Sequence, residues 1–304
     1  MIELVFLGTG AAVPTESRGL PSIVLRYFGE LLMFDCGEGT QRQFVKAKLG
    51  LNKPTKIFIT HMHGDHVFGL PGLLHTMDLF GRERKLEIYG PPALAKFLKA
   101  VMEACGLASD YEVEVYSIVG EGTILETERY SVKALKVPHT DNSYAFAFVE
   151  KERPGKFDVE KAMKLGLKPG PLYKKLQMGE SVKLPDGTVI RPEDVLGPPR
   201  PGLKVVYSGD TPYYERMVDF SRGADVLIHD SSFLERDREK ALESGHSTVL
   251  DAVKVAREAR VKLLVLTHIS ARYAEDEEAL LEEAKKHFEN VVLAKDLMRL
   301  KLRG

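Results

Sequence analysis

The stretch IFITHMHGDHVFGLPG, residues 57–72, decides the fold of this chain. Its first four residues form a short apolar run that favours a buried strand. Within the next six positions come His61, His63, Asp65 and His66. Imidazole and carboxylate groups do not form a core, because burying them unpaired leaves polar atoms without partners. A solvated polar loop is the alternative, but four potential ligands this close together favour a metal site.

Three further strand-like runs also end at a potential ligand. LKV precedes Pro138-His139, KVVYSG precedes Asp210, and LLVLT precedes His268. Strands that pack into one sheet system can bring residues about 200 positions apart in the sequence to a common rim. Taken alone, His139 or His268 could equally well be a metal ligand or a structural residue. The repeated placement at strand ends favours ligands.

The combined ligand set contains nitrogen and carboxylate oxygen and no thiolate. This composition suits Zn²⁺ in a catalytic site, and Mn²⁺ or Fe would also be accepted. Two ions can be served, in which case Asp210 bridges and the ligands divide into two sets: His61, His63 and His139 for one ion, and Asp65, His66 and His268 for the other. Two metals about 3.5–4 Å apart that share a water suit the hydrolysis of a phosphodiester.

Proton transfer requires further groups. Asp65 can orient or deprotonate the attacking water, in addition to binding metal. A leaving 3′ oxygen needs a proton, and we expect His246 in the GHST segment to supply it, because His246 is not needed as a ligand. A solvated histidine at a helix start is the alternative for His246. Asp35 and Asp230 are predicted to accept N–H bonds from metal-bound histidines, and His229 is a further candidate.

The composition limits what the protein can be. A chain of 304 residues with 44% hydrophobic residues supports one large domain or two smaller ones. The formal net charge of −1 means that any nucleic-acid contact must depend on a local patch. Two cysteines, no signal-like N-terminus and no apolar run of membrane-spanning length predict a soluble cytoplasmic protein without a membrane anchor.

Strand and helix patterns alternate along most of the chain and predict an α/β fold. A hairpin is expected around Gly29-Glu30, and helices are expected over residues 40–49, 70–80 and 91–106 and after Ser247 or Thr248. After the last strand pattern only a short basic tail is expected.

Residues 151–200 differ from the rest. Thirteen of the fifty are Gly or Pro, and eleven Lys and Arg stand against seven Asp and Glu, a local balance of +4. The sparse apolar periodicity predicts an irregular insert, either a functional excursion or a tolerated surface insertion. No pattern in the sequence points to a separate protein partner.

The order and spacing of several motifs resemble one known family over nearly the whole chain. These motifs are FLGTGAAVP (6–14), DCGEGTQRQ (35–43), THMHGDHVFGLPGLL (60–74), SGDT (208–211), HDSSF (229–233), GHST (245–248) and LTHISARY (266–273). HxHxDH alone resembles the metallo-β-lactamase superfamily. Together the motifs resemble the short form of its ribonuclease Z family, endoribonucleases that remove the 3′ trailer from tRNA precursors.

The resemblance implies a four-layer αββα sandwich, two zinc ions per subunit on the ligands named above, Asp65 as proton acceptor and His246 as proton donor. It also implies a homodimer, precursor tRNA as substrate, and an inserted flexible tRNA-binding arm at residues 151–200 within a single domain spanning residues 1–304. Gly166 and the run Lys168 to Pro171 resemble the glycine-proline tip of that arm.

One segment departs from the family pattern. Members often carry PxKxRN early in the chain, where this sequence reads PTESRG from Pro14 to Gly19. The alternative function is a small-molecule hydrolase of the same superfamily, such as a phosphodiesterase, thioesterase or lactonase. The basic insert favours the RNA enzyme, because a small substrate does not need it. A non-catalytic RNA-binding scaffold is disfavoured, because every expected ligand is present.

Overall fold

The computed structural model describes residues 1–107 and 109–302. They form two compact units. Of the described residues, the larger unit comprises Met1–Thr127, Ser131–Phe148 and residues 204–302, and the smaller comprises mainly residues 149–203.

The larger unit is built on two seven-stranded sheets. The first has the order β18-β1-β3-β4-β5-β6-β7 and consists of β1 (Ile2–Gly8), β3 (Ser22–Tyr27), β4 (Glu30–Phe34), β5 (Thr55–Phe58), β6 (Leu86–Gly90), β7 (Val113–Ser117) and β18 (Arg299–Leu302). The second has the order β17-β15-β14-β13-β10-β9-β8 and consists of β8 (Gly122–Glu126), β9 (Tyr130–Lys136), β10 (Tyr144–Glu150), β13 (Lys204–Tyr207), β14 (Val226–Asp230), β15 (Leu264–Thr267) and β17 (Val291–Leu293). Near the site, β2 (Gly10–Ala11) pairs in parallel with β16 (Ile269–Ser270).

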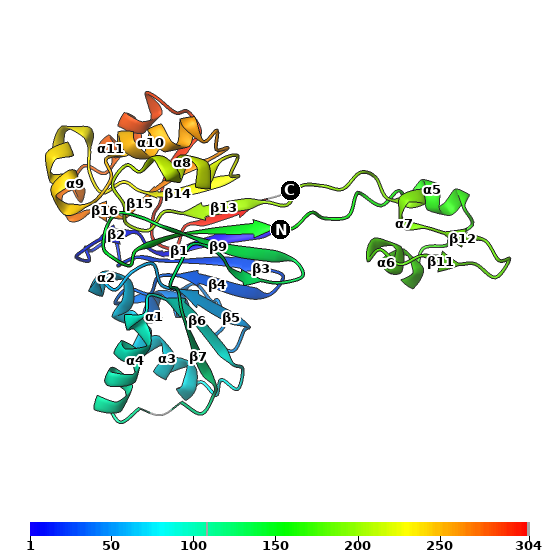
Figure 1. The fold of residues 1–304 in the computed structure, drawn as a ribbon, viewed down its shortest axis with the longest axis horizontal. Helices are drawn as coiled ribbons and strands as arrows, with labels where there is room; N and C mark the ends of the chain where they lie inside the picture. The colour runs from blue at the N-terminus through cyan, green and yellow to red at the C-terminus, as the bar shows by residue number, and fades with distance from the viewer. Residues whose placement is uncertain (108, 303–304) are drawn as a thin grey trace. The chain divides into compact units, whose positions relative to one another are not determined.

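Helices cover the outer face of each sheet (Figure 1). The first sheet carries α1 (Thr40–Lys46), α2 (Gly64–Val67), α3 (Gly69–Leu79) and α4 (Ala93–Ala104). The second carries α8 (Glu215–Ser221), α9 (Arg238–Ser244), α10 (Val249–Glu258) and α11 (Glu278–Lys285), with short 3₁₀ turns at Glu235–Asp237 and Ala271–Tyr273. This is the four-layer αββα arrangement that the family resemblance implies.

An aromatic ladder fills the space between the two sheets. Phe34, Phe58, Tyr89 and Tyr116 are register partners on the parallel strands β4 to β7, and adjacent rings stack at centroid distances of 5.4, 5.0 and 4.8 Å. Phe146 of the opposite sheet packs 5.7 Å from the ring of Phe58. All the ladder residues lie near the carboxyl ends of their strands. Large aromatic side chains therefore pack beside the rim where the chain turns out toward the predicted ligands.

The last strand, β18, was not predicted. It pairs antiparallel with β1, with Leu300 and Leu302 opposite Leu4 and Ile2. In this strand Arg299 and Lys301 are exposed and alternate with the half-buried Leu300 and Leu302. The charge of this segment suggested a basic tail. The alternation of basic and apolar side chains with a period of two is instead typical of an edge strand.

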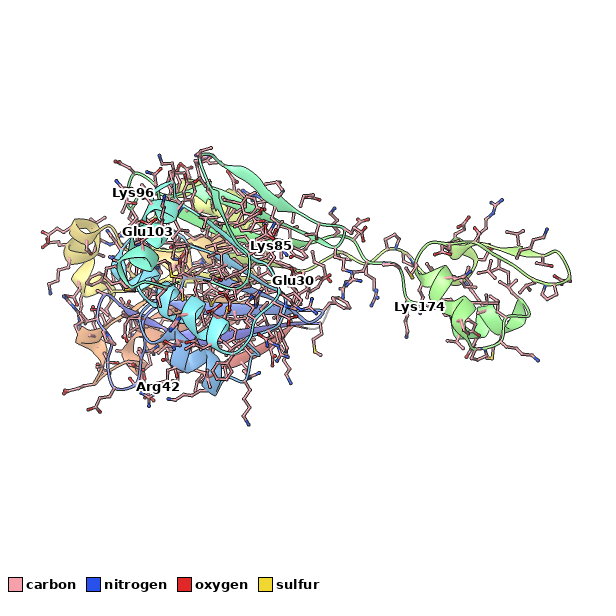
Figure 2. The ribbon with its side chains drawn as sticks, turned by 90° about the horizontal axis from the view of Figure 1, so that it is seen from below. Glu30, Arg42, Lys85, Lys96, Glu103 and Lys174 are labelled. Atoms are coloured by element: carbon pink, nitrogen blue, oxygen red, sulfur yellow. The ribbon has the colours of Figure 1, made fainter. Side chains whose placement is uncertain are left out.

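The smaller unit is more regular than its composition suggests. It contains α5 (Val159–Lys164), α6 (Pro171–Gln177), α7 (Pro192–Val195) and a short hairpin of β11 (Val182–Lys183) and β12 (Val189–Ile190). Six buried residues form its own small core: Ala162, Leu167, Leu176, Val182, Ile190 and Val195. The prediction of an irregular insert is wrong on this point, because its elements are too short to show periodicity. Lys174 on α6 is exposed on this unit (Figure 2).

Within the part of the chain that was searched, no helix combines the length and the apolar character that crossing a bilayer requires.

Candidate metal centre

The seven predicted ligands converge at one rim of the larger unit. Polar atoms of His61, His63, His139 and Asp210 lie within 4.8 Å of one another, and so do those of Asp65, His66, Asp210 and His268. Asp210 belongs to both groups. The two groups match the two ligand sets that the sequence predicts. The structure therefore brings together residues separated by more than 200 positions in the chain.

Each ligand is placed by a strand end or by the turn that follows it. β5 ends at Phe58, and the chain then runs past His61 into the one-turn helix α2, which carries Asp65 and His66. Asp210 follows β13, and His268 follows β15 in a left-handed backbone conformation with φ of +60°. A non-glycine residue in this conformation is strained, which is common where geometry serves a site.

Asp210 is the centre of the arrangement. Its Oδ2 atom lies 3.1 Å from Nε2 of His66, 3.3 Å from Nε2 of His268 and 3.6 Å from Nε2 of His61. Burial alone would raise the pKa of the Asp210 carboxyl, but His268 and His66 hold it well below its usual range. Asp210 is therefore an anionic oxygen surrounded by imidazole nitrogens.

The hydrogen bonds on the far side of each ring orient the imidazoles. Nδ1 of His139 donates to the Gly245 carbonyl at 2.8 Å, and Nδ1 of His66 donates to Asp35 at 2.8 Å. With Nδ1 carrying the proton, the lone pair of Nε2 faces the cluster.

These lone pairs are a direct test of whether a cation fits. Among the described residues, Nε2 of His61, His66 and His268 is buried without a hydrogen-bond partner. Three convergent, unpartnered acceptors beside an aspartate would be costly to bury for structural reasons alone. Nε2 of His139 also lies 3.1 Å from Nδ1 of His63, close to the separation of about 3.3 Å between two nitrogen ligands of a tetrahedral zinc with bonds of 2.0–2.1 Å. The residues fit a bound cation.

Asp65 is held by the N-terminal loop as well as by its own helix. Its Oδ2 atom accepts the backbone N–H of Ala12 at 3.0 Å and lies 3.5 Å from Nε2 of both His66 and His268. Ala12 has φ of +57°, so this loop is strained where it meets the site. Burial opposes ionisation, but the two histidines keep the pKa of Asp65 below its usual range.

His246 lies beside the ligand cluster and is hydrogen-bonded to Asp230. Nδ1 of His246 donates to Oδ2 of the fully buried Asp230 at 2.9 Å, and the two form a further close group with Asp210 and His268. Burial lowers the pKa of His246, but the Asp230 carboxylate outweighs it and raises the pKa to about 9. The Asp230 carboxylate therefore favours the protonated form of this imidazole.

Asp230 also supports His268, as predicted. Nδ1 of His268 donates to Ser232 Oγ at 2.9 Å, and Ser232 Oγ lies 2.6 Å from Asp230 Oδ1. His229 does not belong to this support: its Nδ1 donates to the backbone carbonyl of Asp230, and the ring is buried in the core. Sequence reasoning missed Ser232, although its place in HDSSF directly after Asp230 was a usable signal.

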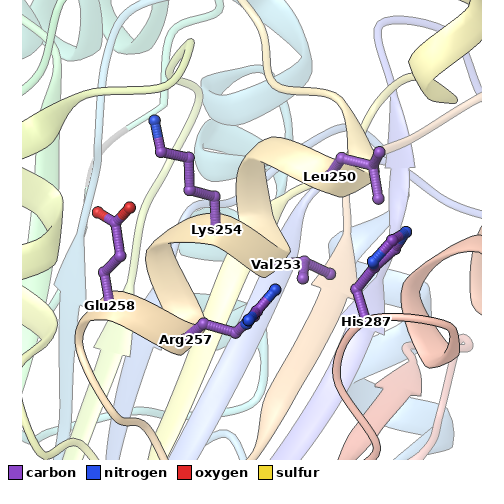
Figure 3. A pocket seen from close by; sticks show the side chains of 6 residues that line it. All are labelled: Leu250, Val253, Lys254, Arg257, Glu258 and His287. Atoms are coloured by element: carbon purple, nitrogen blue, oxygen red, sulfur yellow. The ribbon is translucent and has the colours of Figure 1, made fainter.

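A separate cavity of about 530 Å³ lies outside this cluster. Figure 3 shows that its lining includes Leu250, Lys254 and Arg257 of α10 and His287, which follows α11. None of the predicted ligands lines it. Its size therefore does not make it the reaction site, because the convergent acidic and imidazole groups lie elsewhere.

Comparison with known proteins identifies the family. The chain matches a family model described as anti-Pycsar protein Apyc1 over residues 2–154 and one described as beta-lactamase superfamily domain over residues 191–269. It is 46% identical to ribonuclease Z of Methanosarcina mazei over 99% of this chain and 98% of that protein. It is 45% identical to ribonuclease Z of Methanothermobacter thermautotrophicus over 100% and 98%. Among solved structures, the short form of human tRNase Z is similar, with 32% identity, 99% coverage of both chains and a TM-score of 0.73.

Proposed function

This chain belongs to the ribonuclease Z family of the metallo-β-lactamase superfamily, and from that premise we propose how its clustered side chains cleave a tRNA precursor. The enzyme is a metal-dependent endoribonuclease that processes tRNA 3′ ends. The observation that supports our assignment of the site is the convergence of Nε2 lone pairs on Asp210, because that donor set accepts cations.

Two zinc ions would be held here, one by His61, His63 and His139 and one by Asp65, His66 and His268, and Asp210 would be a ligand to both. When bound, the zinc ions would lower the pKa of the nucleophilic water and neutralise charge on the phosphoryl oxygens. Mn²⁺ or Fe would suit the same oxygen and nitrogen donors, and elemental analysis of the purified protein measures which metal is bound and how many ions each subunit holds.

The protein's own groups handle the protons. Asp65 takes the proton of the water whose oxygen attacks phosphorus. As the bond from phosphorus to the 3′ oxygen breaks, His246 gives its Nε2 proton to that oxygen. The products are a tRNA with a 3′-hydroxyl and a trailer with a 5′-phosphate. Asp230 supports this role by holding Nδ1 of His246 at 2.9 Å, which leaves Nε2 as the transferable site.

We assign residues 151–200 as the tRNA-binding arm. Its +4 charge balance suits phosphate contacts, and these contacts position a substrate without reading its sequence. A homodimer, in which the arm of one subunit holds tRNA at the site of the other, is the assembly we expect from the family. Sedimentation with and without tRNA tests it, and a monomer that cleaves at full rate would exclude this division of labour.

The decisive experiment incubates the protein with an end-labelled tRNA precursor and maps the cut to single-nucleotide resolution. We expect one cut at the 3′ end of the tRNA body and none with Asp65→Ala. Hydrolysis of small phosphodiesters without cleavage of the precursor would instead support the small-molecule enzyme. The same map locates the cut relative to CCA.

Arg18 lies in the segment Pro14 to Gly19, which departs from the family pattern. Its guanidinium is buried and donates to Glu277 at 2.6 and 2.9 Å. It also donates to Thr9 and to the Ala294 carbonyl. Arg18 thus holds the loop in place and is not available to RNA.

A further inference from the structure

We propose that Asp35 is a positioning residue shared by both metal sites, and that Thr60 and Tyr207 hold it in that role. The inference rests on the two-metal centre proposed above. It assigns one buried carboxylate to fix a histidine of each ligand set.

The contacts of Asp35 lead to both sets. Oδ2 accepts Nδ1–H of His66 directly at 2.8 Å. The route to His61 has two steps: the Thr60 hydroxyl donates to the Asp35 carboxylate at 3.0 Å, and Nδ1 of His61 lies 3.0 Å from that hydroxyl. Because the single hydroxyl proton of Thr60 points to the carboxylate, its oxygen can only accept from His61. Both rings are thereby fixed with Nε2 toward the centre.

Asp35 is itself fixed from two sides. Oδ1 accepts the backbone N–H of Thr60 at 2.8 Å, and Oδ2 accepts the hydroxyl of Tyr207 at 2.9 Å. Tyr207 is the last residue of β13 in the second sheet, whereas Asp35 directly follows β4 in the first. The hydroxyl therefore couples the two sheets at the base of the centre, three residues before Asp210.

The backbone supports a positioning role. Asp35 is fully buried and has φ of +58°, an uncommon conformation for a non-glycine residue. A buried carboxylate with this strain persists only where its surroundings determine it fully, and functional sites are where such residues gather. Every contact that holds Asp35 here leads to a ligand-bearing segment.

The second sheet contains a matched counterpart, which provides the control. The Ser232 hydroxyl lies between Nδ1 of His268 at 2.9 Å and the buried Asp230 carboxylate at 2.6 Å. The Thr60 hydroxyl lies in the same way between His61 and Asp35. Loss of either hydroxyl frees one ring, but the two rings belong to different ligand sets.

The test measures zinc affinity of the full-length protein by chelator competition, together with cobalt spectra and thermal melting. We expect Asp35→Asn to weaken both sites by about 10- to 100-fold, because the new amide N–H opposes His66 Nδ1–H. Thr60→Val should weaken mainly the site with His61, and Ser232→Ala mainly the site with His268. Thr60→Ser keeps the hydroxyl and should bind zinc as the wild type does. Tyr207→Phe should perturb the cobalt spectrum of both sites.

Equal zinc affinities in Thr60→Val, Tyr207→Phe and wild type would overturn the proposal. So would losses of affinity that follow the melting temperature in every variant, since Asp35 would then only stabilise the fold. The measurement needs no RNA. Failure of the wild type to cleave a tRNA precursor would therefore count against the function alone, while these affinities would still test Asp35.

Discussion

At the scale of single residues, His246 provides the sharpest test of the proposed chemistry. We expect His246→Ala to lower kcat for precursor cleavage by about 10²- to 10⁴-fold, the usual contribution of a general acid. Zinc content should remain at the wild-type value, because the ring donates to Asp230 and is not needed by either ligand set. Single-turnover cleavage and elemental analysis measure the two quantities.

His287→Ala is the matched control for this substitution. That ring is exposed beside the separate cavity, away from the cluster, so its removal should leave cleavage unchanged. Loss of zinc from His246→Ala would show that His246 is a ligand instead of a proton donor.

The positions of the ligands could be predicted from the sequence because each follows a strand pattern or lies in the HxHxDH run. The supporting contacts could not. The bond from Tyr207 to Asp35 depends on how β13 in one sheet lies against β4 in the other, and no local pattern encodes that alignment. The hydrogen bond from the Ala12 N–H to Asp65 could not be predicted either, because the donor is a backbone group, which every residue type except proline has.

At the scale of elements, the aromatic ladder predicts where the fold is most sensitive. Phe58 is fully buried between Phe34 and Tyr89 at centroid distances of 5.4 and 5.0 Å. We expect Phe58→Ala to lower the free energy of unfolding by about 3–5 kcal/mol, as large cavities in packed cores do. Denaturant unfolding of the metal-loaded protein measures this change.

Tyr116→Ala is the comparison, since Tyr116 ends the same ladder with 38% of its surface exposed. Its cost should be clearly smaller than that of Phe58→Ala. Equal losses would mean that stacking along the ladder, and not burial, sets the stability.

The smaller unit allows a clean deletion. Arg153 and Arg200 form an antiparallel bridge, with N–H to O=C distances of 2.9 Å in both directions. Replacing residues 154–199 by Asn-Gly should close this bridge with a two-residue turn. We expect the variant to lose cleavage of precursor tRNA while it still hydrolyses a small phosphodiester at the wild-type rate, because no ligand lies in the deleted segment.

Equal loss of both activities would contradict the assignment of residues 151–200 as a tRNA-binding arm. Melting of the variant shows whether the larger unit still folds.

Long helices that begin at a capping residue could be predicted from the sequence. Thr248 caps α10 by accepting the N–H of Asp251, as its place before an apolar helical pattern indicated. The helices of the smaller unit have four to seven residues, which is too short for a 3.6-residue period to appear. Their small core was hidden by the glycines and prolines between them.

At the scale of the whole molecule, the net charge of −1 conceals an uneven distribution. The +4 balance of residues 151–200 leaves the remainder at −5, so any attraction to a polyanion is local. The sequence contains no surface pattern that identifies a partner face, so it does not predict subunit number. Metal dependence of stability, in contrast, follows from the site itself.

Removal of metal should destabilise the entire fold. Without cations, Oδ1 of Asp210 and the Nε2 atoms of His61, His66 and His268 are buried without a hydrogen-bond partner among the described residues, which is costly. A ligand that binds only the folded state stabilises it by about 4 kcal/mol at 1,000 times its Kd, for each site. Zinc added to chelator-treated protein should therefore raise Tm in a concentration-dependent manner, as scanning calorimetry can record. Asp210→Asn removes the shared anion and should strongly reduce the rise. An identical Tm for the chelated and zinc-loaded wild type would show that the cluster holds no cation in the folded protein.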